Sequence, residues 1–184
     1  MAATVVINEW NSAGSITDKT SGTVRFKNAN NATVDLNDPL VVPTSGQEYS
    51  FEKWLRLQIT DAGGFTQIGD LEVYTDGIGF SETGIKAWYA LEGTFQTPVI
   101  PDEGQDPPFF NGPSTGSPGN AMEDLFGLTV GAPGDLDAIN SGPFTDGSPT
   151  EHIGDWIVIV MEVEPTASAG VLGAETLTFA YSEI

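Results

Sequence analysis

The amino-acid sequence predicts an all-β fold: a single β-sandwich domain over residues 1–184, jelly-roll-like or Ig-like, with long loops rich in Gly and Pro. Apolar residues recur with a period of two or in short runs, and Gly, Pro, Asn and Asp bound these segments. No long apolar stripe follows helical spacing. The 184 residues are 39% hydrophobic and 10% aromatic, which supplies one domain with a real core.

Eight segments show the strand pattern. In the fourth, Leu55, Leu57 and Ile59 alternate with other side chains, so one face of this strand is predicted to be buried. The last segment alternates in the same way. The predicted strands are residues 4–9, 22–28, 33–36, 48–60, 69–75, 84–90, 154–164 and 175–181.

One predicted strand differs from the others because it is apolar on both faces. Residues 156–161 read Trp-Ile-Val-Ile-Val-Met, which is typical of a central strand covered on both sides. The alternation returns after Met161, and the strand is expected to end at Pro165, since proline cannot donate to a ladder.

One short helix is predicted in an otherwise β chain. Asn120 is suited to cap its N-terminus, and Glu123, three residues later, completes a capping box. Gly127 follows Leu125 and Phe126 as a stop signal. Helical content is therefore expected to be about a tenth of the chain or less, well below the usual third.

Two stretches are too rich in Gly and Pro to pair in a sheet. These residues fill ten of the 23 positions from 98 to 120 and seven of the 20 from 131 to 150. We expect an extended arm at about 98–120 and a second long loop at about 131–150. The first contains Pro107-Pro108-Phe109-Phe110, whose aromatic pair either folds back on the domain's own sheet or anchors in a neighbouring subunit.

The charge balance is strongly acidic: 26 Asp and Glu against six Lys and Arg give a formal net charge of −20. Nucleic acid is excluded as a partner because its binding depends on many basic residues. Anionic membrane surfaces repel such a chain, and no apolar run approaches the roughly 18 residues of a membrane span. The N-terminus has no basic, apolar pattern of a secretory signal, so export by that route is not expected.

The basic residues all lie within residues 1–86, where the net charge is −5, while residues 87–184 carry −15. Two interpretations stay open: the two halves face different neighbours, or they intermix in one fold. Few Lys and many acids also suit a protein that works in salty water, where the negative surface is screened.

The residues needed for most enzyme classes are missing from the sequence. There is no cysteine, and His152 is the only histidine, which we expect to be a solvated loop residue. No phosphate-binding Gly-rich loop with the Lys and Ser or Thr of a nucleotide site is present. A carboxylate-pair glycosidase remains an alternative, but no compact pair of acids indicates one. We therefore expect no enzymatic activity.

Calcium is the one cofactor that the composition permits, because it takes oxygen ligands. Two loops are rich in acids, residues 135–140 and 102–106, but neither has the spacing of an EF-hand. The prediction is therefore no cofactor, with Ca²⁺ as a weakly indicated alternative.

Three segments resemble a poorly characterised group of tailed-bacteriophage virion proteins. They are Tyr49-Ser50-Phe51-Glu52-Lys53-Trp54-Leu55-Arg56-Leu57, the stretch from Gly64 to Tyr74, and the ending Glu175 to Ile184. The resemblance implies a β-sandwich structural protein of the particle, a capsid decoration or cement protein. It implies no catalytic or ligand-binding residues.

The leading hypothesis is accordingly a non-enzymatic protein, made in the host cytoplasm, on the outer capsid surface of the virion. Its partners would be the major capsid protein and its own copies, with a trimer favoured. Phe109 and Phe110 would anchor in the neighbour, while a set of basic residues pairs with acidic patches there. This set is Arg25, Lys27, Lys53 and Arg56.

A second hypothesis is a phage tail or fibre-associated adhesion module that binds host carbohydrate. Exposed Trp10, Trp54 or Trp88 would then serve as stacking platforms for sugars. The alternative for these side chains is that they pack in the core, since Trp is usually mostly buried.

Overall fold

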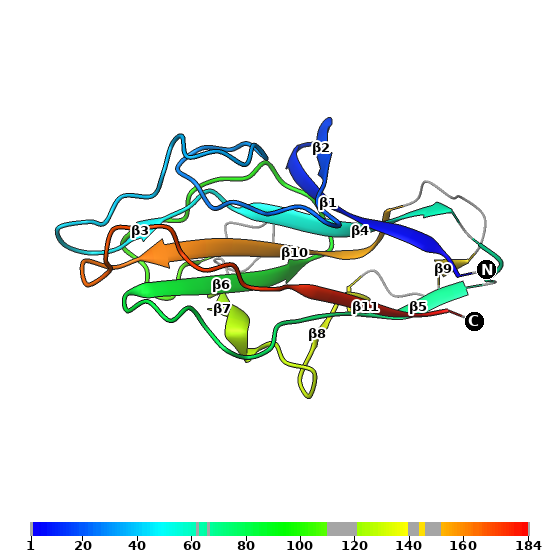
Figure 1. Ribbon diagram of the computed structural model, residues 1–184. Coiled ribbons are helices and arrows are strands. Elements are labelled where there is room, and N and C mark those ends of the chain that lie inside the picture. Colours follow the sequence, from blue (N-terminus) through cyan, green and yellow to red (C-terminus); the bar gives the residue numbers. More distant parts are fainter. Residues whose placement is uncertain are drawn as a thin grey trace.

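The protein is nearly all-β, built from two antiparallel sheets in a sandwich-like arrangement, as the sequence predicts (Figure 1). The structure is a computed structural model that describes residues 2–61, 63–65, 67–109, 121–139, 144–145 and 152–183. The described helical structure is a single 3-10 turn, Leu125–Gly127.

The first sheet has seven strands, and β10 (His152–Val163) lies near its middle. The order is β2-β1-β4-β10-β6-β7, with β3 also paired to β10. The other bounds are β1 (Thr4–Ser12), β2 (Ser15–Asp18), β3 (Glu48–Tyr49), β4 (Lys53–Asp61), β6 (Ile85–Glu92) and β7 (Glu123–Asp124).

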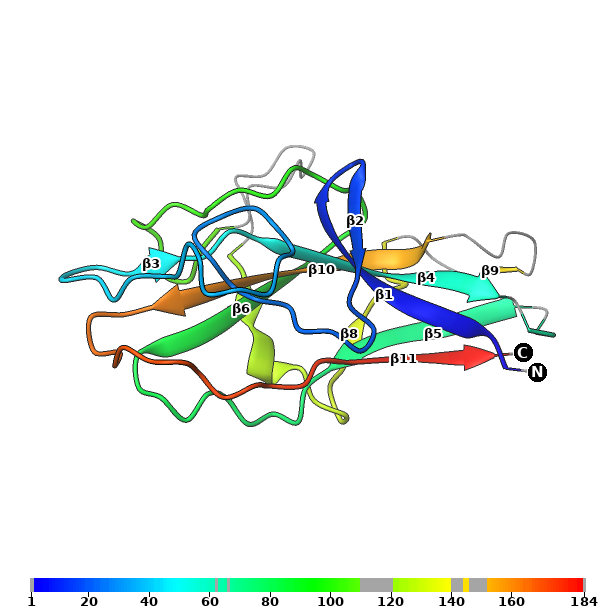
Figure 2. The ribbon, with the colours of Figure 1, turned by 45° about the horizontal axis from the view of Figure 1, so that its top comes forward.

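The second sheet has four strands and packs against one face of the first. Its order is β11-β5-β8, with β9 also paired to β5. The bounds are β5 (Gln67–Tyr74), β8 (Gly134–Asp135), β9 (Phe144–Thr145) and β11 (Thr178–Glu183). Both chain ends lie at the same end of the molecule (Figure 2), where the backbone N–H of Ala3 donates to Glu183 Oε1 at 2.7 Å.

Apolar side chains fill both faces of the first sheet. Between the sheets, Leu57 of β4, Val73 of β5 and Ile157 of β10 belong to one buried cluster. On the opposite face, Trp54 and Val158 belong to a second cluster. Residues 153–163 of β10 are all buried, which confirms the prediction of a central strand covered on both sides.

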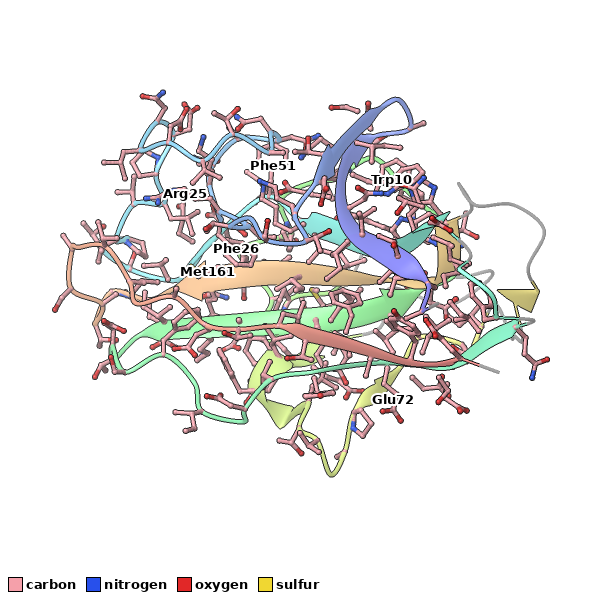
Figure 3. The ribbon with its side chains drawn as sticks, turned by 45° about the vertical axis from the view of Figure 1, so that its right-hand side comes forward. Trp10, Arg25, Phe26, Phe51, Glu72 and Met161 are labelled. Atoms are coloured by element: carbon pink, nitrogen blue, oxygen red, sulfur yellow. The ribbon has the colours of Figure 1, made fainter. Side chains whose placement is uncertain are left out.

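The prediction of strands at 22–28 and 33–36 is wrong. The alternation in the first is real, because Val24 and Phe26 pack against the core, but residues 19–47 contain no strand and form a layer of loops over the first sheet (Figure 3). Hydrogen bonds within the layer replace a ladder: Asn28 N–H, for example, donates to Asp38 O at 2.8 Å.

The predicted helix is also shorter than expected and starts later. Glu123 belongs to β7, and Asp124 caps the 3-10 turn by accepting from Phe126 N–H at 3.0 Å. Asn120, the predicted cap, lies outside the described residues. An Asp directly before the turn satisfies an end N–H as well as the predicted box would.

A β-bulge in β10 connects the two sheets. The pairing with β4 shifts between Ile153 and Ile157, and Gly154 in the bulge has φ +69°. The N–H of Asp155 donates to Leu136 O at 2.6 Å, while Leu136 N–H donates to Leu71 O of β5 at 2.8 Å. Backbone hydrogen bonds thus run from the second sheet into the bulge of the first.

A buried charge cluster joins β1, β4 and the loop layer. The Glu9 carboxylate is fully buried; its Oε1 accepts from Lys53 Nζ at 3.0 Å, and Lys19 Nζ lies 3.5 Å from Oε2. Asn11 Nδ2 also donates to Oε1, at 3.3 Å. Burial lowers the pKa of Lys53, and the neighbouring Glu9 carboxylate partly offsets that effect.

The same two lysines hold the loop layer in place. Lys19 Nζ donates to the carbonyl oxygens of Thr23 at 2.9 Å and Ala32 at 2.7 Å. Lys53 Nζ donates to Asn31 O at 2.8 Å. The carbonyls of a segment without a ladder thereby gain buried donors, which a layer packed on a sheet requires.

We expect Gly154→Ala to destabilise the protein by about 2 kcal/mol or more, because the left-handed backbone disfavours a side chain and the added Cβ would meet Leu136 O at 2.8 Å. Urea unfolding measures the difference. Gly14→Ala is the control, since its Cβ would meet nothing within 4 Å. Equal stability of the two variants would contradict the connecting role of the bulge.

We expect Lys53→Met to lower the free energy of unfolding by about 3 kcal/mol, because it leaves the buried Glu9 carboxylate without its closest cation. The measurement is chemical denaturation at pH 7 against the exposed control Glu175→Gln, which should change by about 0.5 kcal/mol or less. A loss below 1 kcal/mol for Lys53→Met would show that the pair is not a main support of the fold.

Candidate functional site

The structure places the proposed interface cations in two different environments. Lys27 and Lys53 lie inside the protein: Lys53 pairs with Glu9, and Lys27 Nζ donates to Asp35 Oδ1 at 2.5 Å. Because both amines are buried and paired within the protein, they cannot contact a neighbouring subunit. Their predicted assignment as interface residues is therefore corrected: they support the fold from inside. Arg25 and Arg56 are half-buried.

Arg56 of the proposed set and Lys86, which is outside that set, are also engaged within the protein. The Arg56 guanidinium lies over the Trp156 ring at 3.8 Å and donates from Nε to Gly154 O at 2.8 Å. Lys86 pairs with the carboxylates of Glu164 at 2.6 Å and Glu162 at 3.1 Å. Partial burial alone would lower the pKa of Lys86, but its hydrogen bonds to these carboxylates raise it.

Most of the positive charge is therefore directed inward or neutralised. Of the described acids, all but Glu9, Glu52, Asp155 and Glu162 are at least partly exposed. Strand β10, from the acidic second half, pairs with β4 from the first half. Strands from the two halves thus pair in one sheet. Of the two interpretations of the charge asymmetry, the structure supports the one in which the halves intermix in one fold. The exterior that results is dominated by carboxylates.

Residues 98–109, called the arm here, lie against the outer face of the first sheet. The Tyr49 hydroxyl donates to Gln105 O at 2.5 Å, and Met122 N–H donates to Pro108 O at 2.8 Å. Asp106 lies 3.7 Å from Lys86 Nζ. The described residues of the arm therefore fold back on the domain's own sheet. The two predicted placements concerned Phe109 and Phe110, and Phe110 lies outside the described residues.

A buried carboxyl group holds the start of the arm. Glu52 is 2% exposed; its N–H donates to Val99 O at 3.0 Å, and Val99 N–H donates to Glu52 Oε2 at 3.2 Å. Trp54 Nε1 donates to the same oxygen at 3.0 Å. Burial raises the pKa of Glu52 to about 7, although both hydrogen bonds oppose the shift.

The arm presents one aromatic ring at its described end. Phe109 forms an isolated bridge with Ala121 and is 39% exposed. Phe110 lies outside the described residues. A partly exposed ring on backbone that is fixed at several points is the feature of this face best suited to contact another protein, because little ordering is needed on binding.

The predicted aromatic platforms differ in accessibility. Trp54 is fully buried, which confirms the core alternative for this residue. Trp10 is half-buried and packs against Phe95 at 5.3 Å and Trp156 at 5.7 Å between ring centroids. Trp88 is half-buried, and its Nε1 donates to Glu162 Oε2 at 2.6 Å.

His152 is not the solvated loop residue that the sequence suggested. It begins β10, is half-buried, and its ring meets Trp10 edge-on at 4.9 Å between centroids. Its Nε2 lies 3.1 Å from Asn8 Nδ2. Burial and the nearby Arg56 charge lower the pKa of His152, so the ring is mostly neutral at pH 7.

The acidic loops considered for calcium have structural roles where they are described. Asp137 Oδ1 accepts from Leu71 N–H at 3.0 Å, and Asp135 Oδ1 accepts from Asp137 N–H at 2.9 Å. Within the described ranges, no group of three or more acids or histidines is placed to hold a metal ion. No described helix is long and apolar enough to cross a bilayer.

Sequence reasoning missed the two residues that fix the arm, Tyr49 and Glu52. The available signal was Glu52 itself, an acid between the hydrophobic Phe51 and the strand that starts at Lys53. A carboxylate at such a position must find partners when it is buried.

A scan against protein-family models and searches of curated proteins and of solved structures found no match for this chain. The functional interpretation therefore rests on the arm, the charges and the packing described above.

We expect Glu52 to make stability depend on pH. Because its folded pKa is raised from 4.5 to about 7, the folded protein binds more protons than the unfolded chain between these values. The free energy of unfolding should therefore rise as the pH falls from 8 to 5, by roughly 3 kcal/mol from this group. Urea unfolding at pH 5, 6, 7 and 8 measures the rise.

The matched variant is Glu52→Gln, which cannot titrate. The difference in unfolding free energy between wild type and variant should shift in favour of wild type on acidification, whereas other acids affect both proteins equally. Parallel pH profiles would contradict the assignment to Glu52.

Proposed function

We propose that this chain is a non-enzymatic structural protein of a tailed-bacteriophage virion, a decoration or cement protein that binds the major capsid protein on the outer shell. The observation that carries the proposal is the combination of an acidic exterior with Phe109 presented on a fixed arm. Such a surface suits contact with a basic protein surface and needs no catalytic groups.

The inward placement of the cations supports a basic partner. Lys19 and Lys53 pair with Glu9 in the charge cluster, and Lys27 pairs with Asp35. Lys86 pairs with Glu162 and Glu164. What faces outward is mainly Asp and Glu, so complementary charge must come from the partner. Exposed ion pairs contribute only about 0 to 1 kcal/mol each, so they orient the contact more than they hold it.

Retention on the shell then depends on apolar burial at the arm. Phe109 is 39% exposed in the free protein, and covering an aromatic side chain at the centre of an interface commonly dominates its affinity. The arm does not have to fold on binding, because Glu52, Tyr49 and Met122 already fix its described residues. The entropic cost of docking is correspondingly small.

Several residues of the segments that resemble phage virion proteins have identifiable structural roles in this fold. Within residues 49–57, Tyr49 and Glu52 hold the arm, and Lys53 holds the loop layer. The similar segment thus contains the supports of the proposed docking face. This supports the proposal that the shared residues preserve one arrangement of arm and loops.

Contacts between copies of the chain are the second part of the proposal, with a trimer as the expected unit. Each copy carries a formal charge of −20, so copies repel one another at low ionic strength and associate through apolar contacts. At physiological ionic strength, salt largely screens the repulsion between charges more than about 8 Å apart. The same screening makes the protein suited to salty surroundings.

We expect Phe109→Ala to weaken binding of the purified protein to capsids that lack it by at least tenfold, which corresponds to about 1.4 kcal/mol. Co-sedimentation with purified particles measures the affinity. Val171→Ala is the control, because Val171 is also exposed but does not belong to the arm. Both variants should unfold at the same denaturant concentration as wild type.

Full capsid occupancy by Phe109→Ala would overturn the arm as the docking element. Labelling of the tail instead of the head by immunogold would overturn the decoration assignment. Saturable binding to host glycans would favour the adhesion-module hypothesis in its place.

A further inference from the structure

Strand β6 has an edge that is only partly paired. On one side, its residues Ile85 to Glu92 all pair with β10. On the other side, β7 pairs with Trp88 and Tyr89 alone. In the described part of the chain, Ile85, Lys86 and Ala87 therefore have no ladder partner on that side.

A groove of about 370 Å³ opens along this edge. The edge residues from Ile85 to Trp88 line it together with residues of the 3-10 turn and of the connection between β5 and β6. Phe80 and Phe126 supply its aromatic surface, with their ring centroids 5.3 Å apart. Gly77 and Gly127 belong to its lining as well.

This geometry fits an extended polypeptide. Each residue of an antiparallel strand directs its N–H and C=O to one side, and successive residues alternate. Part of the Ile85–Ala87 backbone must therefore point into the groove, where a guest strand can pair with it. The glycines leave room for the guest backbone, and the aromatic rings offer surfaces for its side chains.

The charges around the groove select a basic guest. Asp124 lines the groove. Asp76 and Glu123 each precede a lining residue in the sequence, and both are exposed. Lys86 does not reverse this balance, because Glu162 and Glu164 already pair with it. A second copy of the chain, with its own charge of −20, is repelled by the same carboxylates.

We propose that the groove along β6 binds an extended, basic segment of another protein by strand addition. The segment pairs with the free edge of Ile85–Ala87, places apolar side chains against Phe80, Phe126 and Trp88, and directs basic side chains to the carboxylates. Phe109 does not belong to the lining of this groove, and the proposal holds whether or not the protein decorates a capsid.

The test uses a blocked octapeptide of alternating Lys and Val, with a Glu and Val peptide of the same length as its charge control. Peptides are titrated into the full-length ¹⁵N-labelled protein and followed by NMR. We expect saturable binding with a dissociation constant below about 1 mM. The largest shifts should fall on the amides of Ile85–Ala87 and on the Trp88 indole, and the acidic peptide should not bind.

Gly127→Trp should weaken the binding at least tenfold, because a Cβ at Gly127 meets nothing within 4 Å and an indole there can occupy the groove without disturbing the fold. Gly170→Trp is the matched control, since Gly170 is equally open but does not line the groove. Matching unfolding curves verify that both variants are folded.

No saturable binding at 1 mM Lys and Val peptide overturns the proposal. Shifts centred away from β6, equal binding of the acidic peptide, or full binding by Gly127→Trp overturn it as well. None of these results bears on capsid location, so the groove and the decoration function fail separately.

Discussion

The burial of Glu9 between two lysines is the interaction on which most of this structure depends. A carboxylate in a protein interior is tolerated only when it is closely paired, and here Lys53 and Lys19 supply the charges from β4 and from the start of the loop layer. The same amines bind loop carbonyls. One charge cluster therefore joins two strands to a segment that has no ladder of its own, and leaves the exterior anionic.

The arm and the groove along β6 are linked through Lys86. Its Nζ contacts Asp106 of the arm at 3.7 Å and the carboxylates of Glu162 and Glu164 in and after β10, while the residue itself lines the groove. A guest that moves Lys86 would alter an arm contact. The bulge at Gly154 fixes β10 against the second sheet, so β6 and the arm rest on an anchored central strand.

Periodicity in the sequence was sufficient to predict the fold class. Leu55, Leu57 and Ile59, which alternate with other residues in the sequence, are buried in the structure, while the residues between them are partly exposed. Periodicity could not show whether a neighbouring strand exists, so the alternation around Val24 and Phe26 predicted a strand that is absent. Short strands such as β7 carry too few residues for a pattern. The burial of Lys53 depends on the Glu9 carboxylate, 44 positions away, and a local sequence pattern cannot show that the two residues meet. The open edge of β6 depends on the order of strands in the sheet, which the sequence pattern does not show either.

The distribution of lysine and arginine also determines how the protein meets a protease. Trypsin cleaves after these residues, and all six lie within residues 1–86, most of them buried, half-buried or held by carboxylates. The folded molecule offers this enzyme few usable sites. Residues 87–184 contain no Lys or Arg at all, so tryptic digestion of even the unfolded chain releases them as one long peptide that includes the arm and β10.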